Sequence, residues 1–292
     1  MSLDLKRSLL RRRTLVSQIL SGLTWVCAII ACVPLFSVLY MLIVRGGSRL
    51  NWEVLVELPP AAFDPGGGFG NAIVGTLVMV GIGGLLSVPL GIIIAIYTAE
   101  LGPHSRSAYI ARFCAKTLTG LPSILAGVFA YAAVVLVTGT YSAWAGGVAL
   151  ALLMVPTVVL TAEVALEMVP RAMREAAFGM GCNRTQVIFK VVLPTAWPAV
   201  QTGVMLAVAR ASGETAPLLF TALFSDYWIR QGGEWQFMEP TASLAVLIYN
   251  YSGMPFDKQI ELAWAASMVL VMMILFINVL SRIISARGRL DN

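Results

Sequence analysis

Two charged residues stand four positions apart inside an apolar stretch that is long enough to cross a membrane. The segment 209–220 reads ARASGETAPLLF and contains Arg210 and Glu214. A charged side chain near the middle of a bilayer is costly, so such residues usually serve a function. Four residues make about one helical turn, which puts both side chains on one face. The arginine fork suits a phosphate-like oxyanion, whereas a purely structural ion pair between helices is the alternative.

The backbone next to this pair is expected to be irregular. Gly213 has no side chain, and Pro217 lacks the N–H group that would bond the carbonyl of Gly213. Irregular backbone at membrane depth is tolerated where it lines a cavity or is buried in protein. Ser212 and Thr215 are candidates to add hydroxyl groups to an anion path. A second candidate turn along such a path is Gly120-Leu-Pro122-Ser123.

The composition identifies an all-α membrane protein. Of 292 residues, 58% are hydrophobic and 12% are charged, whereas soluble domains carry about one quarter charged residues. The runs 14–44, 65–99, 117–162 and 262–281 lack Asp, Glu, Lys and Arg, and a crossing needs about 20 mostly apolar residues. The third run is interrupted at 138–142 and reads as a helical hairpin. The six expected spans are 19–44, 72–97, 118–137, 143–162, 198–223 and 262–284.

Basic residues indicate the orientation, because cytoplasmic segments of membrane proteins are enriched in Lys and Arg. If the N-terminus lies inside, fifteen basic residues fall in inner segments and four in outer ones. The inner residues are Lys6, Arg7, Arg11, Arg12, Arg13, Arg106, Arg112, Lys116, Arg171, Arg174, Arg184, Lys190, Arg282, Arg287 and Arg289, and the outer ones are Arg45, Arg49, Arg230 and Lys258. We therefore expect a multi-pass protein with both termini in the cytoplasm.

The expected organisation has three parts. Residues 1–70 comprise a cytoplasmic basic tail, an uncleaved first span and an outer loop. Residues 71–285 form the membrane core, with a cytoplasmic loop at 163–194, and residues 286–292 are a cytoplasmic tail. No metal site or nucleotide-binding loop is expected, since His104 lacks a ligand pattern and Lys116 follows no glycine frame.

The loop 163–194 carries two helix signatures instead of a short polar connection. Pro170 suits the start of a helix, and Gly181 is a natural stop. Asn183 with Gln186 three residues later is an N-cap pairing for a second helix, and Pro194 is expected to limit that helix. The first helix is amphipathic and rich in small residues, which favours docking in a partner's groove over lying on a membrane surface.

This loop resembles the EAA motif of ATP-binding-cassette importer permeases. The motif is carried here by Glu175-Ala176-Ala177, then Gly181, then Val191-x-Leu193-Pro194, with Val at a position where Ile is usual. The resemblance implies coupling helices that dock on an ATPase subunit, with Arg174, Glu175, Ala176, Ala177 and Gly181 as the coupling residues.

Four further stretches resemble the PstA-type permease of phosphate importers. They are GGGFGNAIVGTL (66–77), SVPLGIIIAIYTAE (87–100), GLPSILAG (120–127) and ARASGETAPLLFTAL (209–223). The resemblance implies the type I importer permease (MetI-like) fold in a bacterial cytoplasmic (inner) membrane. It also implies a PstC-type second permease, two copies of a PstB-type ATPase that binds ATP and Mg, and a PstS-type phosphate-binding protein. In that family the charges corresponding to Arg210 and Glu214 are counted among the transport residues.

Three other functions are weighed against a phosphate importer. An importer of another oxyanion such as molybdate fits the loop but fits the 209–223 stretch less well. An ion-coupled secondary transporter would use the Arg210–Glu214 pair, yet such proteins often contain an internal repeat, which this sequence does not show. A purely structural membrane subunit is disfavoured by the two intramembrane charges.

Overall fold

The computed structural model describes residues 12–61 and 66–287. The expected tails are outside this range at 1–11 and 288–292, including Lys6, Arg7, Arg11 and Arg289. The described part of the chain is mostly helical, as its apolar composition predicts. Its α-helices are α1 (Arg12–Met41), α2 (Trp52–Val56), α3 (Gly70–Ile96), α4 (Arg106–Thr119), α5 (Ser123–Ala130), α6 (Leu136–Thr138), α7 (Ala143–Glu167), α8 (Arg171–Gly179), α9 (Arg184–Val187), α10 (Leu193–Ser212), α11 (Ala216–Thr221), α12 (Leu244–Ser252) and α13 (Asp257–Arg287).

Four π-helical turns and one hairpin complete the described chain. The turns η2 (Leu42–Gly46), η3 (Tyr97–Leu101), η4 (Tyr131–Val135) and η5 (Ile188–Val192) are continuous with neighbouring α-helices. Strands β1 (Arg230–Gln231) and β2 (Glu234–Trp235) pair antiparallel, with Arg230 opposite Trp235. Gly232 and Gly233 form the two-residue connection at φ values of 60° and 92°, the left-handed geometry that tight hairpins need.

Five helices in the described part of the chain are long and apolar enough to cross a membrane. They are Thr14–Gly46, Gly70–Leu101, Ala143–Glu167, Arg184–Ser212 and Asp257–Ile283. A sixth crossing requires α4 together with 123–138, two helices that meet at 107°. The span predicted at 118–137 is therefore not a single helix, and it is broken at 120–122, where a turn was predicted. Pro122 cannot donate a helical hydrogen bond and biases its predecessor away from helix, so α4 ends and α5 starts afresh.

The fifth predicted span also differs from the structure. The predicted span was 198–223 with an irregular turn at Gly213 and Pro217, and the structure breaks the helix there completely: α10 ends at Ser212 and α11 begins at Ala216. At its other end the helix begins much earlier, because α9, η5 and α10 form one continuous helix from Arg184. Pro194 was expected to limit the loop's second helix. Instead it lies in the first turn of α10, directly after the π-helical turn η5. The wider hydrogen-bond spacing of that turn accommodates a residue without an N–H group inside the continuous helix.

Helix α7 is the centre of the helical body, with 61% of its apolar window buried, and it packs against α3 and α10. Small residues permit the close approach that membrane helices use in place of a hydrophobic driving force. A Cβ atom on Gly147 of α7 would lie 2.4 Å from Cγ2 of Ile82 on α3. A Cβ atom on Gly203 of α10 would lie 2.1 Å from Oγ1 of Thr161 on α7. These two contacts fix α3 and α10 on the central helix.

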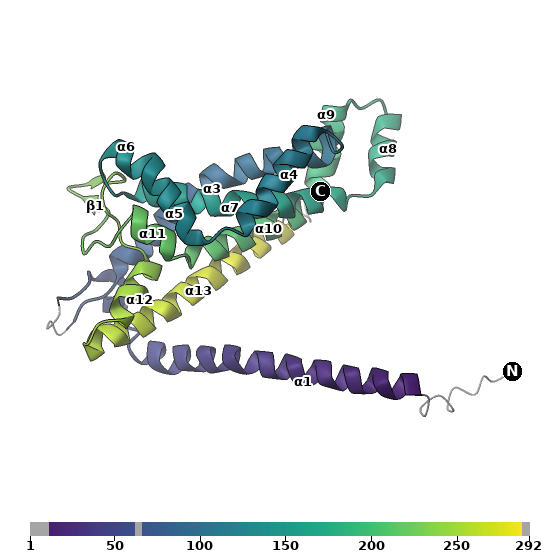
Figure 1. Cartoon of the computed structure of the whole chain (residues 1–292). Coiled ribbons are helices and arrows are strands. Elements are labelled where there is room, and N and C mark those ends of the chain that lie inside the picture. The colour runs from purple at the N-terminus through teal and green to yellow at the C-terminus, as the bar shows by residue number, and fades with distance from the viewer. Residues whose placement is uncertain (1–11, 62–65, 288–292) are drawn as a thin grey trace.

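Helix α1 extends away from this body (Figure 1), and only 6% of its apolar window is buried. Its attachment lies at its C-terminal end, where η2 packs on α13. The Arg45 guanidinium lies 5.5 Å from the ring centroid of Trp264, and Arg49 Nε lies 3.5 Å from a carboxylate oxygen of Glu261. The first span is thus held at one end.

The two ends of the molecule carry different elements (Figure 1). Helices α8 and α9, the first turn of α1 and the end of α13 lie at one end, whereas the β1–β2 hairpin and α12 lie at the other. Inner basic residues such as Arg171, Arg174 and Arg184 belong to α8 and α9, and Arg230 belongs to the hairpin. The basic residues of α8 and α9 and Arg230 of the hairpin therefore lie at opposite ends of the described molecule.

Candidate functional site

The break between α10 and α11 is the first part of the candidate site. The Gly213 N–H donates to the carbonyl of Arg210 at 3.1 Å, and the Glu214 N–H donates to the carbonyl of Ala211 at 3.2 Å. The helix therefore ends in a tightened turn and restarts with Pro217 in the first turn of α11, where its missing N–H costs little. The irregular backbone predicted at Gly213 and Pro217 is present in the structure.

Arg210 and Glu214 form an ion pair at this break. The Nε atom of Arg210 lies 3.4 Å from Oε1 of Glu214. The Arg210 side chain is 44% exposed and that of Glu214 is 17% exposed. Arg210 is in the last turn of α10, where the helix dipole favours a cation. Because a guanidinium has five N–H donors and the pair engages Nε, the exposed fork can still bind an anion at the chain's surface.

Ser212 and Thr215 differ in their surroundings, although both were expected to add hydroxyl groups to the path. Ser212 is 3% exposed, and its hydroxyl donates to the carbonyl of Val208 at 2.8 Å. It therefore points into the protein and not toward the surface that exposes Arg210. Thr215 is half-buried and its carbonyl accepts the N–H groups of Leu218 and Leu219.

The second predicted turn lies at the start of a helix that packs on α11. Helix α5 begins at Ser123, directly after Pro122, and α5 contacts α11 extensively. A Cβ atom on Gly127 would lie 2.6 Å from the Cα atom of Pro217. The structure thus packs together the two short helices that follow the interruptions at 120–122 and 213–215.

The loop at the opposite end of α7 folds as its sequence predicts. Gly181 has a φ of 84°, the Cys182 N–H donates to the carbonyl of Ala177, and the Gly181 N–H donates to that of Phe178. These are the two bonds of a Schellman helix stop. Asn183 and Gln186 then form a complete capping box at the start of α9.

Helix α8 presents two different faces. Ala177 is buried against the body, and the Arg174 side chain is only 18% exposed. Glu175 and Ala176 are exposed, as is Gly181. Large apolar side chains are exposed on or beside the same helix, namely Met173, Phe178 and Met180. Exposed apolar side chains clustered at the polar end of a membrane protein are typical of a protein-docking surface.

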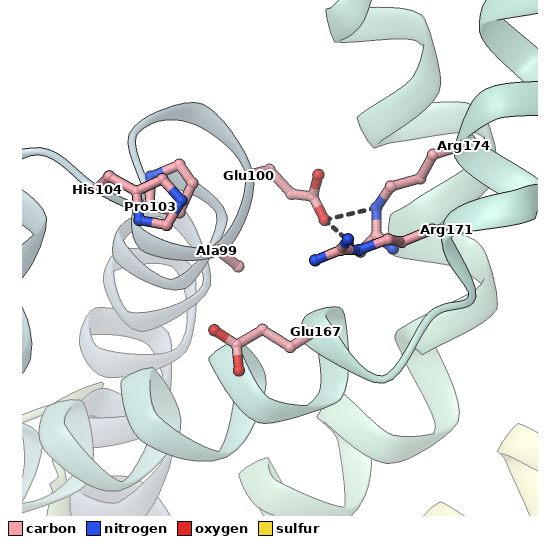
Figure 2. Close-up of a pocket in the computed structure, with 7 residues that line it drawn as sticks. All are labelled: Ala99, Glu100, Pro103, His104, Glu167, Arg171 and Arg174. Atoms are coloured by element: carbon pink, nitrogen blue, oxygen red, sulfur yellow. Dashed lines mark hydrogen bonds and ion pairs between the residues drawn. The ribbon is translucent and has the colours of Figure 1, made fainter.

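A cavity of about 500 Å³ separates α8 from the ends of α3 and α7 (Figure 2). It is lined by Ala99, Glu100, Pro103, His104, Glu167, Arg171 and Arg174. Glu100 and Arg174 form an ion pair across it, with Arg174 Nη2 2.6 Å from Oε1 of Glu100. Beside it, Arg112 Nε lies 2.5 Å from Oε1 of Glu163.

Glu163 is a buried ion-pair partner and Glu100 is a largely buried one. The side chain of Glu163 is 7% exposed and that of Glu100 is 12% exposed. Their position at helix ends in an apolar chain was a signal that such groups need a cation. The sequence did not reveal which arginine each would meet.

Comparison with known proteins gives consistent results. Residues 87–289 match the family described as binding-protein-dependent transport system inner membrane component. The phosphate transport system permease protein PstA of Haemophilus influenzae is 39% identical over 267 residues, covering 91% of this chain and 93% of the relative. The probable PstA protein of Methanocaldococcus jannaschii is 33% identical and covers 86% of each chain. A chain of the inward-facing MetNI methionine ABC transporter has a TM-score of 0.57 at 17% identity, covering 75% of this chain and 93% of that one, so the fold is shared.

Proposed function

Because the chain belongs to the family of binding-protein-dependent transport system inner membrane components, we propose that it is the PstA-type permease subunit of an ATP-driven importer of inorganic phosphate. As a permease it is a transport component and not an enzyme. The observation that carries the substrate assignment is the exposed Arg210 fork at the interrupted end of α10, in a chain that is similar to PstA proteins over nearly its whole length.

The proposed path runs past the broken helices. Arg210 supplies the cation for a phosphate oxyanion, and Glu214 holds its charge balanced while the path is empty, which lowers the cost of burying either group. Gly213, Thr215 and Pro217 form the turn, and Pro122 with Ser123 forms the second turn on the packed helix α5. In this proposal Ser212 secures the helix end through Val208 and does not contact the anion.

The proposed coupling surface is the exposed face of α8. Glu175, Ala176 and the neighbouring Met173 and Phe178 are accessible to a partner. We expect this face to fill a groove of a PstB-type ATPase subunit, which binds ATP and Mg. A PstC-type second permease completes the path, and a PstS-type protein delivers phosphate from outside. The chain then lies in a cytoplasmic membrane with both termini inside.

Two other functions are distinguished from this one by the reconstitution experiment described below. The family assignment and the α8 surface disfavour an ion-coupled secondary transporter. A permease for another oxyanion such as molybdate shares the fold and the loop, and differs only in the anion that Arg210 accepts.

Reconstitution of the co-purified complex in proteoliposomes tests the assignment. Tagged chain extracted in mild detergent should bring an ATPase and a second permease with it. With its binding protein and ATP inside, the complex should accumulate radiolabelled phosphate, and excess molybdate should not compete. Uptake driven by an ion gradient without ATP, or stronger uptake of molybdate, would contradict the proposal.

A further inference from the structure

Three arginines converge on the π-helical turn η3 at the end of the second span. Arg112 of α4 donates from Nη2 to the carbonyl of Thr98 at 2.7 Å. Arg174 of α8 donates to the carboxylate of Glu100, and Arg184 of α9 donates to the carbonyl of Glu100. Because free carbonyls and the helix dipole make this terminus negative, it favours cations. Two of these arginines belong to the loop that carries the proposed docking helix.

Arg174 joins three elements with one guanidinium. From α8 it contacts Oε1 of Glu100 through Nε at 3.2 Å and through Nη2 at 2.6 Å. The same group donates to the carbonyl of Leu166 at 2.8 Å and to the carbonyl of Val169, at the end of α7. A planar fork with fixed donor directions transmits position better than a single flexible contact. Arg174 therefore links α8 to both the second and the fourth span.

Arg112 of α4 also connects the ends of the second and fourth spans, through contacts that do not involve α8. It contacts Glu163 of α7 at 2.5 Å, and it donates to the carbonyls of Thr98 and Pro103. The ends of α3 and α7 are consequently tied to each other by Arg112 even if Arg174 is removed. The Arg174 contacts are the ones that add α8 to this unit.

The cavity shows why these contacts matter for motion. Beside the buried Ala177, which shares a core cluster with Ile96 and Leu166, a space of about 500 Å³ lies between α8 and the ends of α3 and α7. Figure 2 shows the Glu100–Arg174 pair reaching across this space, with Glu167 and His104 on the body side. On this side of α8 a displacement therefore reaches η3 through the ion pair, because the apolar packing of α8 on the body is made by Ala177.

We propose that Glu100 and Arg174 are positioning residues that carry the movement of α8 to the second and fourth spans during transport. The proposal rests on the proposed function, in which α8 docks on an ATPase. Arg174 was expected to be a coupling residue, and its side chain faces the body. Its part in coupling is thus to hold the docking helix to the spans, while the exposed residues of α8 make the docking contacts.

The test compares three kinds of variant in the whole complex in proteoliposomes. Arg174→Gln and Glu100→Gln each break the link, and the double variant removes both charges so that neither is left buried alone. Arg106→Gln removes the same charge from the exposed start of α4, outside the cavity and the docking helix, and is the matched control. Phe178→Glu changes the exposed face and tests docking itself. The readouts are the amount of co-purified ATPase and the phosphate moved per ATP hydrolysed.

The double variant should keep its ATPase, because its docking face is intact. The phosphate moved per ATP should fall about tenfold, within the range typical for coupling between sites, while Arg106→Gln should move as much phosphate per ATP as the unchanged chain. Normal phosphate per ATP in an assembled double variant would overturn the positioning role. If the Phe178→Glu variant still co-purifies with its ATPase, α8 is not the docking surface, and that part of the proposed function is wrong. The phosphate moved per ATP does not depend on how much complex remains assembled. If the Glu100–Arg174 pair only stabilised the structure, its removal would therefore leave this ratio unchanged.

Discussion

Gly127 lies so close to Pro217 that a Cβ atom on the glycine would be 2.6 Å from the Cα atom of the proline and 3.1 Å from its carbonyl oxygen. Real Cβ atoms do not approach backbone this closely, so any side chain at Gly127 must move α5 away from α11. The relationship joins helices that start after two separate interruptions of the chain.

Gly127→Val should therefore destabilise the assembled protein and reduce phosphate uptake. Overpacking of a tight contact costs about 1–3 kcal/mol, and here the displaced partner carries the turn beside Arg210. Thermal unfolding of the purified complex and uptake measure the two effects. Gly84→Val is the matched control, because a Cβ atom there meets nothing within 4 Å. Equal melting temperatures of the two variants would contradict the argument.

Gly181→Val should disturb the stop of α8, because Gly181 has a φ of 84°. A left-handed conformation costs a side-chain-bearing residue about 1–2 kcal/mol, and a β-branched one tolerates it poorly. We expect less co-purified ATPase and less phosphate moved per ATP. Gly181→Asn should be milder, since asparagine is the other residue found at such stops. If valine and asparagine behave alike, backbone conformation is not the cause.

Arg210→Gln should abolish most uptake and lower the amount of assembled complex. Breaking a buried pair typically costs about 3–5 kcal/mol, although the exposure of Arg210 reduces this penalty. The double change with Glu214→Gln removes both charges and should restore assembly without restoring uptake. Near-normal uptake in the double variant would show that the pair is only structural.

Tyr251 of α12 should report on the end of the protein that carries the β1–β2 hairpin at alkaline pH. Burial, with a smaller contribution from the charge of Asp226, raises the pKa of its phenol to about 12. The folded pKa exceeds the unfolded value of about 10, so this stabilising contribution is complete below about pH 10 and is lost toward pH 12. Between pH 9 and pH 11 the melting temperature of the Tyr251→Phe variant should fall less than that of the unchanged chain. Tyr249→Phe, at an exposed site, should leave the decrease unchanged.

Single cysteines should reveal the sidedness. In a background without Cys27, Cys32, Cys114 and Cys182, a cysteine in place of the exposed Gln231 should react with an impermeant thiol reagent applied to intact cells. A cysteine in place of Met180, also exposed, should react only after the membrane is opened. The reverse pattern would invert the topology.

The features that the sequence predicted correctly depend on local interactions. The Asn183–Gln186 capping box and the stop at Gly181 involve neighbours a few residues apart, so residue type and spacing determine them. The Arg210–Glu214 pair is likewise set by one helical turn. Each of these was predicted from short-range physics and is present in the structure.

The features that were missed depend on distant contacts. Glu163 meets Arg112 across 51 positions, and Glu100 meets Arg174 across 74. Helical periodicity does not identify which distant residues pair. A buried carboxylate needs a cation, and the sequence contains several arginines that could supply it. The turn at 120–122 was predicted from Pro122, but the angle of 107° between the two helices was not, because hydropathy counts apolar residues and does not register a change of helix direction.

The exposed first span, attached to the body at one end through η2, has a consequence for how its sequence is constrained. A helix in a packed core must satisfy the shape of its neighbours, and a change of one methylene group is felt. Helix α1 is only 6% buried over its apolar window, and within this chain the segment that follows it packs mainly near Trp264 and Glu261. Packing therefore places little constraint on the order of the apolar residues in α1, and its length and hydropathy are the main requirements. Exchanging leucines, isoleucines and valines along α1 should leave the fold of the remaining chain intact, whereas the same exchanges along α7 should not.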